Sequence, residues 1–546
     1  MTTVEFDTPF LPNAIYTRAN AGEVFPYVLE PLTWSFLGPQ IERGFMRCMA
    51  DDFAAATPIP GGYRACGRMA GRLHLNLSVF RTVAERAPGS TARDLDVQYF
   101  GDAVASGLPA HPTGTDTVGD KARTTTAALR TMLTVDRRIR REKAAAIAAL
   151  DDARRAAASL DDPVVLLDRF DRILPLYGDT FGTHVTARAL TSSAVTMATG
   201  ALGRIGVGQN EAIALISRLP DLESAKPSAR LRAIAVRAAA DPRVADVLRR
   251  AGARDELDAI DSPTARETAA AIDAFVAEFG HRGVNEFDPT APVWGTDPSL
   301  VRQLLRHGLA DADAPRQAED PGLRGVAGML VRRARAAIVR AETTKDNVIR
   351  TSHALRVLLG AALERMPPLD RATALALTYP QLRAVAAGGA VPREDADRRR
   401  AELAAVRDRE PAEWSIGTLS FAAQTGNDTA TTDDAGLAEI AGLAGSPGCA
   451  TARVRVLRSA DDDFDDGDVI VARVTDTAWT PLFLAASAIV TDSGGSFSHA
   501  TIVARELGIP AVVNTKTATL DLRDGDLVEV DGDAGVVRII ERTERA

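Results

Sequence analysis

The residue composition and the spacing of apolar residues change near residue 410, and this change most constrains what the chain can fold into. Before it, long runs rich in Ala, Arg, Leu and Glu carry apolar residues at helical spacing, as in DKARTTTAALRTMLTVDRRIRREKAAAIAALDDARRAAASL. After it, short Val- and Ile-rich segments such as DVIVARV and DLVEV alternate with Gly and Asp turns. We therefore expect a multidomain α + α/β chain, with a large, mainly α-helical domain over residues 1–409, a flexible linker over 410–438 and a small β/β/α domain over 439–546.

Composition narrows the class of protein. Hydrophobic residues make up 46% and charged residues 25% of the 546, as in soluble globular proteins. The net charge of −9 argues against a nucleic-acid partner. Three scattered cysteines, no signal-like start and no apolar run near the ~20 residues of a membrane helix predict a cytoplasmic protein without a membrane partner.

The stretch AIVTDSGGSFSHATIVARELGIPAVV, which begins at Ala488, predicts a strand, a turn and a helix in succession. Gly494 and Gly495 permit a tight turn, and Ser498 is a good N-cap for a helix that starts with HATIVAREL. Gly508 and the Pro that follows end that helix. His499 is thus expected in the first helical turn.

That position suits a particular chemistry. A helix N-terminus disfavours a protonated imidazole and offers unpaired N–H groups to phosphate oxygens. His499 is therefore either a nucleophile that forms a phosphohistidine or a structural capping residue, and local physics leaves both open. A serine triad of Ser496, His499 and Asp492 is weaker, because triad members normally converge from different elements. No ligand-spaced cluster accompanies them, so we expect no metal or organic cofactor on this chain.

The same stretch resembles the phosphohistidine signature of the mobile, swivelling domain of phosphoenolpyruvate (PEP)-utilising enzymes. Upstream, GSPGCATARVRVL and GDVIVARVTDTAWTPLF resemble the opening strands of that domain. Ala452 and Asn514 depart mildly from residues that are often glycine in the family. The matching residues are Gly494, Gly495, Ser498, His499, Ala504, Arg505, Glu506, Gly508, Pro510 and Ala511.

This resemblance implies a small swivelling phosphohistidine domain at the C-terminal end. It also implies that His499 carries a phosphoryl group, and we expect Gly494, Gly495, Ser498 and Arg505 to form a phosphate cradle around it.

The first part of the chain resembles the substrate-binding domain of rifampin phosphotransferases. The resemblance rests on NAIYTRANAGEVFPYVLEPLTWSF, GRLHLNLS, FGHRGVNEFDPTAPVW and LALTYPQLRAV. In a functional interpretation of the third motif, we expect His281 or Glu286 to take the acceptor's proton and Arg282 to bind the phosphoryl group. Alternatively, Arg282 and Glu286 form a structural ion pair.

In the first motif, NAIYTRANAGEVFPYVLEPLTWSF, three polar residues are candidates for the substrate site. Arg18, Asn20 and Glu23 either line that site, or Asn20 and Glu23 are turn and capping residues.

Nothing in the sequence resembles a nucleotide-binding module: there is no GxxxxGK[ST] motif and no early β-rich region. Only 47 residues follow His499, whereas a PEP-binding TIM barrel needs about 200. In combining these two domains without a nucleotide-binding module, the sequence resembles the His-bearing subunits of phenylphosphate synthase and cresol-phosphorylating systems.

The resemblance implies a phosphotransferase component of dikinase type. A separate ATP-grasp subunit with ATP and Mg²⁺ would load His499, which would phosphorylate a hydroxyl of a small aromatic or apolar acceptor. The alternatives are a subunit that works with a PEP-binding partner, and a non-catalytic ligand-binding or regulatory homologue.

Overall fold

The computed structural model describes residues 5–9, 11–18, 21–55, 65–86, 91–100, 105–109, 117–216, 226–250, 252, 254–283, 285–297, 301–302, 305, 324–366, 368–407, 409, 411–412, 414–421, 431–432, 438–458, 462, 464–475, 479–495 and 498–543. The chain divides into two compact units, and each is described by itself. The first comprises Met1–Leu190, Phe287–Ala291 and Thr343–Ala423, and the second comprises Thr191–Glu286, Pro292–Glu342 and Gln424–Ala546.

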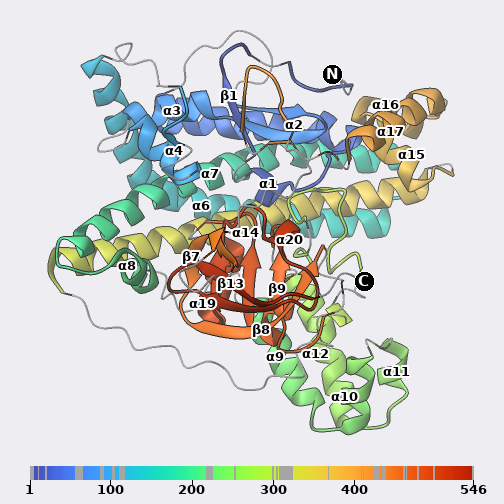
Figure 1. The fold of residues 1–546 in the computed structure, drawn as a ribbon. Coiled ribbons are helices and arrows are strands. Elements are labelled where there is room, and N and C mark those ends of the chain that lie inside the picture. Colours follow the sequence, from blue (N-terminus) through green and yellow to red (C-terminus); the bar gives the residue numbers. More distant parts are fainter. Residues whose placement is uncertain are drawn as a thin grey trace. The chain divides into compact units, whose positions relative to one another are not determined.

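Long helices dominate the first unit (Figure 1). The longest is α6 (Val118–Ser159), which begins at a capping box formed by Thr117 and Asp120. Helices α7 (Pro163–Gly203) and α14 (Gly325–Arg365) contribute to both units. The others are α1 (Ala21–Val24), α2 (Pro31–Arg47), the π-helix η1 (Cys48–Asp52), α3 (Leu77–Arg86), α4 (Ala92–Phe100), α15 (Arg371–Ala376), α16 (Tyr379–Ala386) and α17 (Arg393–Arg407).

A small antiparallel sheet joins distant parts of the first unit. Its strand order is β2 (Cys66–Met69), β3 (Arg72–Asn76), β1 (Ile15–Thr17) and β4 (Trp414–Ile416). Strand β4 pairs with β1, so that Tyr16 lies opposite Ser415. This strand falls inside the stretch that the sequence predicts as a flexible linker, 410–438.

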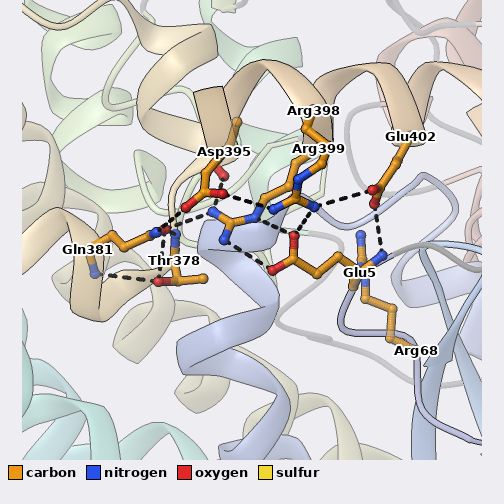
Figure 2. A network of polar contacts seen from close by, with 9 residues as sticks. Glu5, Arg68, Thr378, Gln381, Asp395, Arg398, Arg399 and Glu402 are labelled. Carbon is orange, nitrogen blue, oxygen red and sulfur yellow. Dashed lines mark hydrogen bonds and ion pairs between the residues drawn. The ribbon is translucent and has the colours of Figure 1, made fainter. Parts of the chain in front are cut away.

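Polar contacts also tie the start of the chain to α17, as Figure 2 shows. Arg399 donates to both carboxylate oxygens of Glu5, at 3.0 and 3.2 Å, and Arg398 pairs with the same carboxylate. The backbone N–H of Glu5 donates to Glu402 at 2.9 Å. The hydrogen bond from Arg399 lowers the pKa of Glu5 below its ordinary value. The first described residues are therefore anchored to a helix nearly 400 positions away.

The second unit contains a helical group with its own apolar core around Trp294, Phe275 and Leu248. The helices of this group are α9 (Lys226–Ala238), α10 (Pro242–Arg249), α11 (Arg254–Asp258) and α12 (Pro263–Phe279). Helix α8 (Gln209–Ile216) packs instead with residues of α7 and α14 in a separate apolar cluster. Ser262 caps α12 by accepting a hydrogen bond from the N–H of Ala265.

The C-terminal part is built on one mixed sheet. Its strand order is β5 (Thr431–Thr432), β6 (Ala438–Ala441), β13 (Val536–Glu541), β12 (Leu527–Asp531), β8 (Cys449–Leu457), β9 (Val469–Ala472), β10 (Ala488–Thr491), β11 (Ala511–Val513) and β7 (Leu443–Ser446). Strands β8, β9, β10 and β11 run parallel, and the remaining pairs are antiparallel.

Helices cover both faces of this sheet (Figure 1). On one face, α18 (Thr480–Ala485) and α19 (His499–Leu507) pack on Ile470 and Ile489. On the other face, α20 (Ala518–Asp521) packs against Val471 and Val490. The predicted fold class, a large helical region followed by a small β/β/α domain, is confirmed. None of the described helices combines the length and the apolar character that crossing a bilayer requires.

Candidate functional site

The signature stretch folds as the sequence predicts. Strand β10 leads into a turn in which Gly494 has a φ of 144°, and α19 then begins at His499 with Ser498 as its N-cap residue. Gly508 ends the helix in the left-handed conformation, with a φ of 70°. Since β9, β10 and β11 are parallel, the residues that follow them share one edge of the sheet with this helix N-terminus.

Ser498 is the predicted N-cap, but its side chain makes no capping bond to the helix backbone. Its hydroxyl lies 3.1 Å from the hydroxyl of Thr501, which donates to the carbonyl oxygen of Gly495 at 2.9 Å. A hydroxyl has a single proton. Because Thr501 uses its proton on a carbonyl, the Ser498 hydroxyl must be the donor in the Ser498–Thr501 bond. The side chain of Ser498 therefore braces the turn instead of capping the helix.

The hydrogen bonds of Asp492 indicate a structural position for this residue and not a place in a serine triad. Its carboxylate accepts from the N–H of Thr519 at 2.9 Å and from the hydroxyl of the same residue, while the hydroxyl of Thr515, 3.5 Å away, donates to the carbonyl of Thr491. Burial raises the pKa of Asp492 to about 6, although these bonds and the charge of Arg473 oppose the shift. Asp492 thus ties the end of β10 to α20. Ser496 lies outside the described residues.

The predicted residues of the phosphate cradle lie at opposite ends of α19. The backbone of His499 is the first residue of the helix, while its side chain lies outside what the structure describes. Arg505 stands in the last turn, roughly 9 Å farther along the axis at 1.5 Å per residue. Burial lowers the pKa of Arg505 to about 10. Gly494, Gly495 and Ser498 meet at the helix start, and Arg505 joins them only if its side chain reaches back along the helix.

His281, Arg282 and Glu286 lie in the loop that follows α12. All three are buried, with exposed fractions of 1%, 2% and 3%. The Nε atom of Arg282 lies 3.1 Å from a carboxylate oxygen of Glu286, which is the ion pair that the structural interpretation requires. The loop packs against the backbone of Trp294, whose N–H donates to the carbonyl of Arg282 at 2.9 Å. Catalytic roles for these side chains stay predictions.

Asp288 lies in the same sequence motif and is not among the predicted site residues. It is buried in the first unit and accepts hydrogen bonds from Tyr27 at 2.9 Å and from the hydroxyl and N–H of Thr290 at 2.7 Å. Arg356 donates to its backbone carbonyl at 2.7 Å. The Asp-Pro-Thr sequence was the available signal, since Asp favours such local bonds. Asp288 anchors residues Phe287–Ala291.

The predicted substrate residues near the chain start are only partly described. Arg18 is buried and donates to the carbonyl of Pro26 at 3.3 Å. Burial lowers the pKa of the nearby His74 to about 3, and the charge of Arg18 contributes. Asn20 and the side chain of Glu23 lie outside the described part. Among the described His, Cys, Asp and Glu side chains, no three gather closely enough to hold a metal ion.

Two parts of the chain are similar to known protein families. Residues 464–535 match the family described as PEP-utilising enzyme, mobile domain. The signature stretch with His499 therefore lies in the part of the chain that is similar to this family. Residues 184–366 match the rifampicin phosphotransferase fourth domain, so the resemblance inferred from the sequence motifs is confirmed.

Individual relatives cover different parts of the chain. Prodigiosin synthesizing transferase PigC of Serratia marcescens is 33% identical over 303 residues, which are 50% of this chain and 33% of PigC. A rifampicin phosphotransferase of Streptomyces sviceus is 29% identical over 309 residues, or 51% of this chain and 35% of that enzyme. The uncharacterized phosphotransferase YvkC of Bacillus subtilis is 50% identical over 106 residues, 19% of this chain and 13% of YvkC. The chain thus matches about a third or less of the length of each of these relatives.

Proposed function

We propose that this chain is a phosphotransferase component in which the imidazole of His499 carries a phosphoryl group. An ATP-grasp subunit on a separate polypeptide loads His499 from ATP and Mg²⁺, and His499 then phosphorylates a hydroxyl of a small aromatic or apolar acceptor. The carrying observation is the position of His499: first residue of α19, directly after a glycine turn, in a PEP-utilising mobile domain.

Local geometry supports the carrier role. The first turn of α19 presents unpaired backbone N–H groups, which favour an anion beside His499. Arg473 and Lys516 follow the carboxyl ends of β9 and β11, so the edge that holds this helix start also carries positive charge. Two of the relatives are named as phosphotransferases, which supports phosphoryl transfer as the reaction class.

The helical part supports the acceptor role. Residues 184–366 match a domain of rifampicin phosphotransferases, and the loop with His281, Arg282 and Glu286 lies within this match. In the proposal, Glu286 or His281 takes the proton of the acceptor hydroxyl, and Arg282 binds the transferred phosphoryl group.

Radiolabelled ATP tests the loading step. The chain is incubated with Mg²⁺ and either β-labelled or γ-labelled ATP, alone and with ATP-grasp proteins encoded near its gene. We expect acid-labile, base-stable label from the β-position only, dependent on the second protein. His499→Ala should abolish the label, while the matched change His307→Ala, outside the signature, should leave it intact. Label that persists in His499→Ala contradicts the proposal.

The family match favours one rival, because its description names PEP-utilising enzymes. In that case a PEP-binding partner would load or unload His499. Labelled PEP replaces ATP in the same assay, and label at His499 from PEP but not from ATP would replace our proposal with this rival. Absence of label with both donors and every partner would favour a non-catalytic homologue.

A further inference from the structure

The last residue of β10, Thr491, has a buried hydroxyl group for which the described residues provide no hydrogen-bond partner. Its exposed fraction is 0%, and its Oγ1 atom has no hydrogen-bond partner within the described part of the chain. Burying a hydroxyl without a partner is unfavourable, so such groups are rare in native proteins. The backbone carbonyl of Thr491, in contrast, accepts from the N–H and the hydroxyl of Thr515.

The alternation of β10 places this hydroxyl beneath the start of α19. Side chains two positions apart in a strand share a face. Thr491 therefore shares the face of Ile489, and Ile489 packs with Val503 and Ala504 of α19. A Cβ atom added at Gly494 would lie 3.4 Å from the Oγ1 of Thr491 and 3.0 Å from the Oγ of Ser498. Both hydroxyls therefore flank the small space beside Gly494, just before the helix N-terminus.

Only one of these two hydroxyls has a proton to offer. The Ser498 hydroxyl donates to Thr501, and Thr501 donates to the carbonyl of Gly495. In this arrangement the proton of Ser498 is directed to Thr501. Thr491 has the uncommitted proton, on the face and at the edge where His499 begins its helix.

We propose that the hydroxyl of Thr491 donates a hydrogen bond to a phosphoryl oxygen carried by His499. The proposal rests on the proposed carrier function and adds a phosphoryl-binding residue to it. A phosphoryl group brings three acceptor oxygens, and a hydrogen bond to a charged acceptor is stronger than one between neutral groups. Glycine at 494 leaves the space between the two hydroxyls open, since any larger residue would place its Cβ against them.

The expected consequence is a longer-lived phosphohistidine. Phosphoryl loss passes through a loose transition state, in which the phosphoryl oxygens carry less charge than in the bound group. A donor that binds these oxygens therefore stabilises the ground state more than the transition state and slows hydrolysis.

Chemical phosphorylation tests this without any partner protein. Phosphoramidate transfers its phosphoryl group to an imidazole nitrogen: the donor's P–N bond breaks, a new P–N bond forms, and the imidazole proton leaves with ammonia. The full chain is treated, freed of reagent, and followed by ³¹P NMR at neutral pH, with His499→Ala identifying the His499 signal. The variants are Thr491→Val, Thr491→Ser and, as a matched buried threonine of the same edge, Thr515→Val.

Thr491→Val should shorten the phosphohistidine half-life about tenfold, as expected for one lost bond to a charged group. Its urea midpoint should stay unchanged or rise, because the change removes an unpaired buried hydroxyl. Thr491→Ser should keep most of the half-life. Thr515→Val should lower the urea midpoint and leave the half-life near that of the wild type.

Two outcomes would overturn the role of Thr491 alone: equal half-lives in the wild type and Thr491→Val, or an equal shortening in Thr515→Val. A wild-type chain that gives no signal at His499 would overturn the carrier function, and the role of Thr491 with it.

Discussion

The buried carboxyl group of Asp492 makes the stability of the mobile domain depend on pH. Its folded pKa of about 6 is above the ordinary value of 3.8, so the folded state holds the proton more tightly than the unfolded state. The resulting stabilisation is complete below pH 4 and is lost as the pH rises through 6. The loss amounts to about 3 kcal/mol.

Asp492→Asn, which cannot ionise, removes this dependence. Between pH 4 and pH 7, the free energy of unfolding of the variant should improve by about 3 kcal/mol relative to the wild type. Urea unfolding at several pH values, followed through the buried Trp479 of the same domain, measures the difference. Parallel pH profiles of the two proteins would show that Asp492 is ionised throughout this range.

The buried pair of Arg282 and Glu286 should be costly to break. Glu286→Gln leaves the Arg282 charge buried beside a neutral amide, so we expect a loss of roughly 3–5 kcal/mol in the free energy of unfolding. The double change Arg282→Met with Glu286→Leu removes both charges and should recover most of that loss. Urea unfolding followed by circular dichroism gives the cycle. A Glu286→Gln protein of unchanged stability that no longer transfers phosphoryl groups would instead support Glu286 as the base.

For single residues, the sequence predicted the place of a residue in a turn or helix better than the hydrogen bonds that its side chain makes. Ser498 stands at the N-cap, as the motif indicated, but its proton goes to Thr501. Thr491 was not predicted, because the sequence does not show which buried hydroxyls find partners. Such bonds depend on residues that the fold brings together, and a propensity for capping describes only the local backbone.

Asn514 shows how an element boundary tolerates a departure from the family pattern. It follows β11 with a φ of 61°, a left-handed conformation that favours glycine and that asparagine adopts more readily than other residues. Asn514→Ala should therefore cost about 1 kcal/mol of stability, whereas Asn514→Gly should be close to neutral. Urea midpoints of the two variants decide this, and equal midpoints would mean that the turn relaxes at no cost.

Elements with strong local patterns were predictable, and elements made by distant pairing were not. The Val- and Ile-rich strands around β8 to β13 and helix α19 carry their periodicity and end signals in the sequence. Strands β1 and β4 have three residues each and pair across about 400 positions. Three residues carry too little alternation to recognise, and β4 lies just before the polar, small residues of the stretch 420–436 that favour a linker.

At the scale of the whole molecule, the C-terminal sheet is complete in itself. Every strand from β5 to β13 pairs only with strands between residues 431 and 541, as far as the structure describes them. A domain whose strands pair only with one another can move as a rigid body, and the proposed carrier role requires such a movement. The predicted start at 439 would remove β5 and the first residue of β6 from this sheet.

Strand β4 completes the four-stranded sheet of the first unit. The stability of this unit should therefore depend on whether its C-terminal boundary lies before or after β4. A fragment of residues 1–409, which ends where the sequence predicts the domain to end, lacks β4 and leaves the edge of β1 unpaired. A fragment of residues 1–423 keeps β4 and also the stacking of Arg409 on Phe421, at 4.0 Å from the ring centroid. Pairing and burial of Trp414 and Ile416 should give the longer fragment a melting temperature several degrees higher.

Thermal unfolding of the two fragments, followed by circular dichroism, tests this boundary. Trp414→Ala with Ile416→Ala in the longer fragment is the matched control, because it keeps the length and removes the side chains that β4 buries. We expect this variant to melt close to the fragment of residues 1–409. Equal melting temperatures for all three proteins would mean that residues 410–423 act as the linker that their composition indicates, and that the helical unit is stable without its fourth strand.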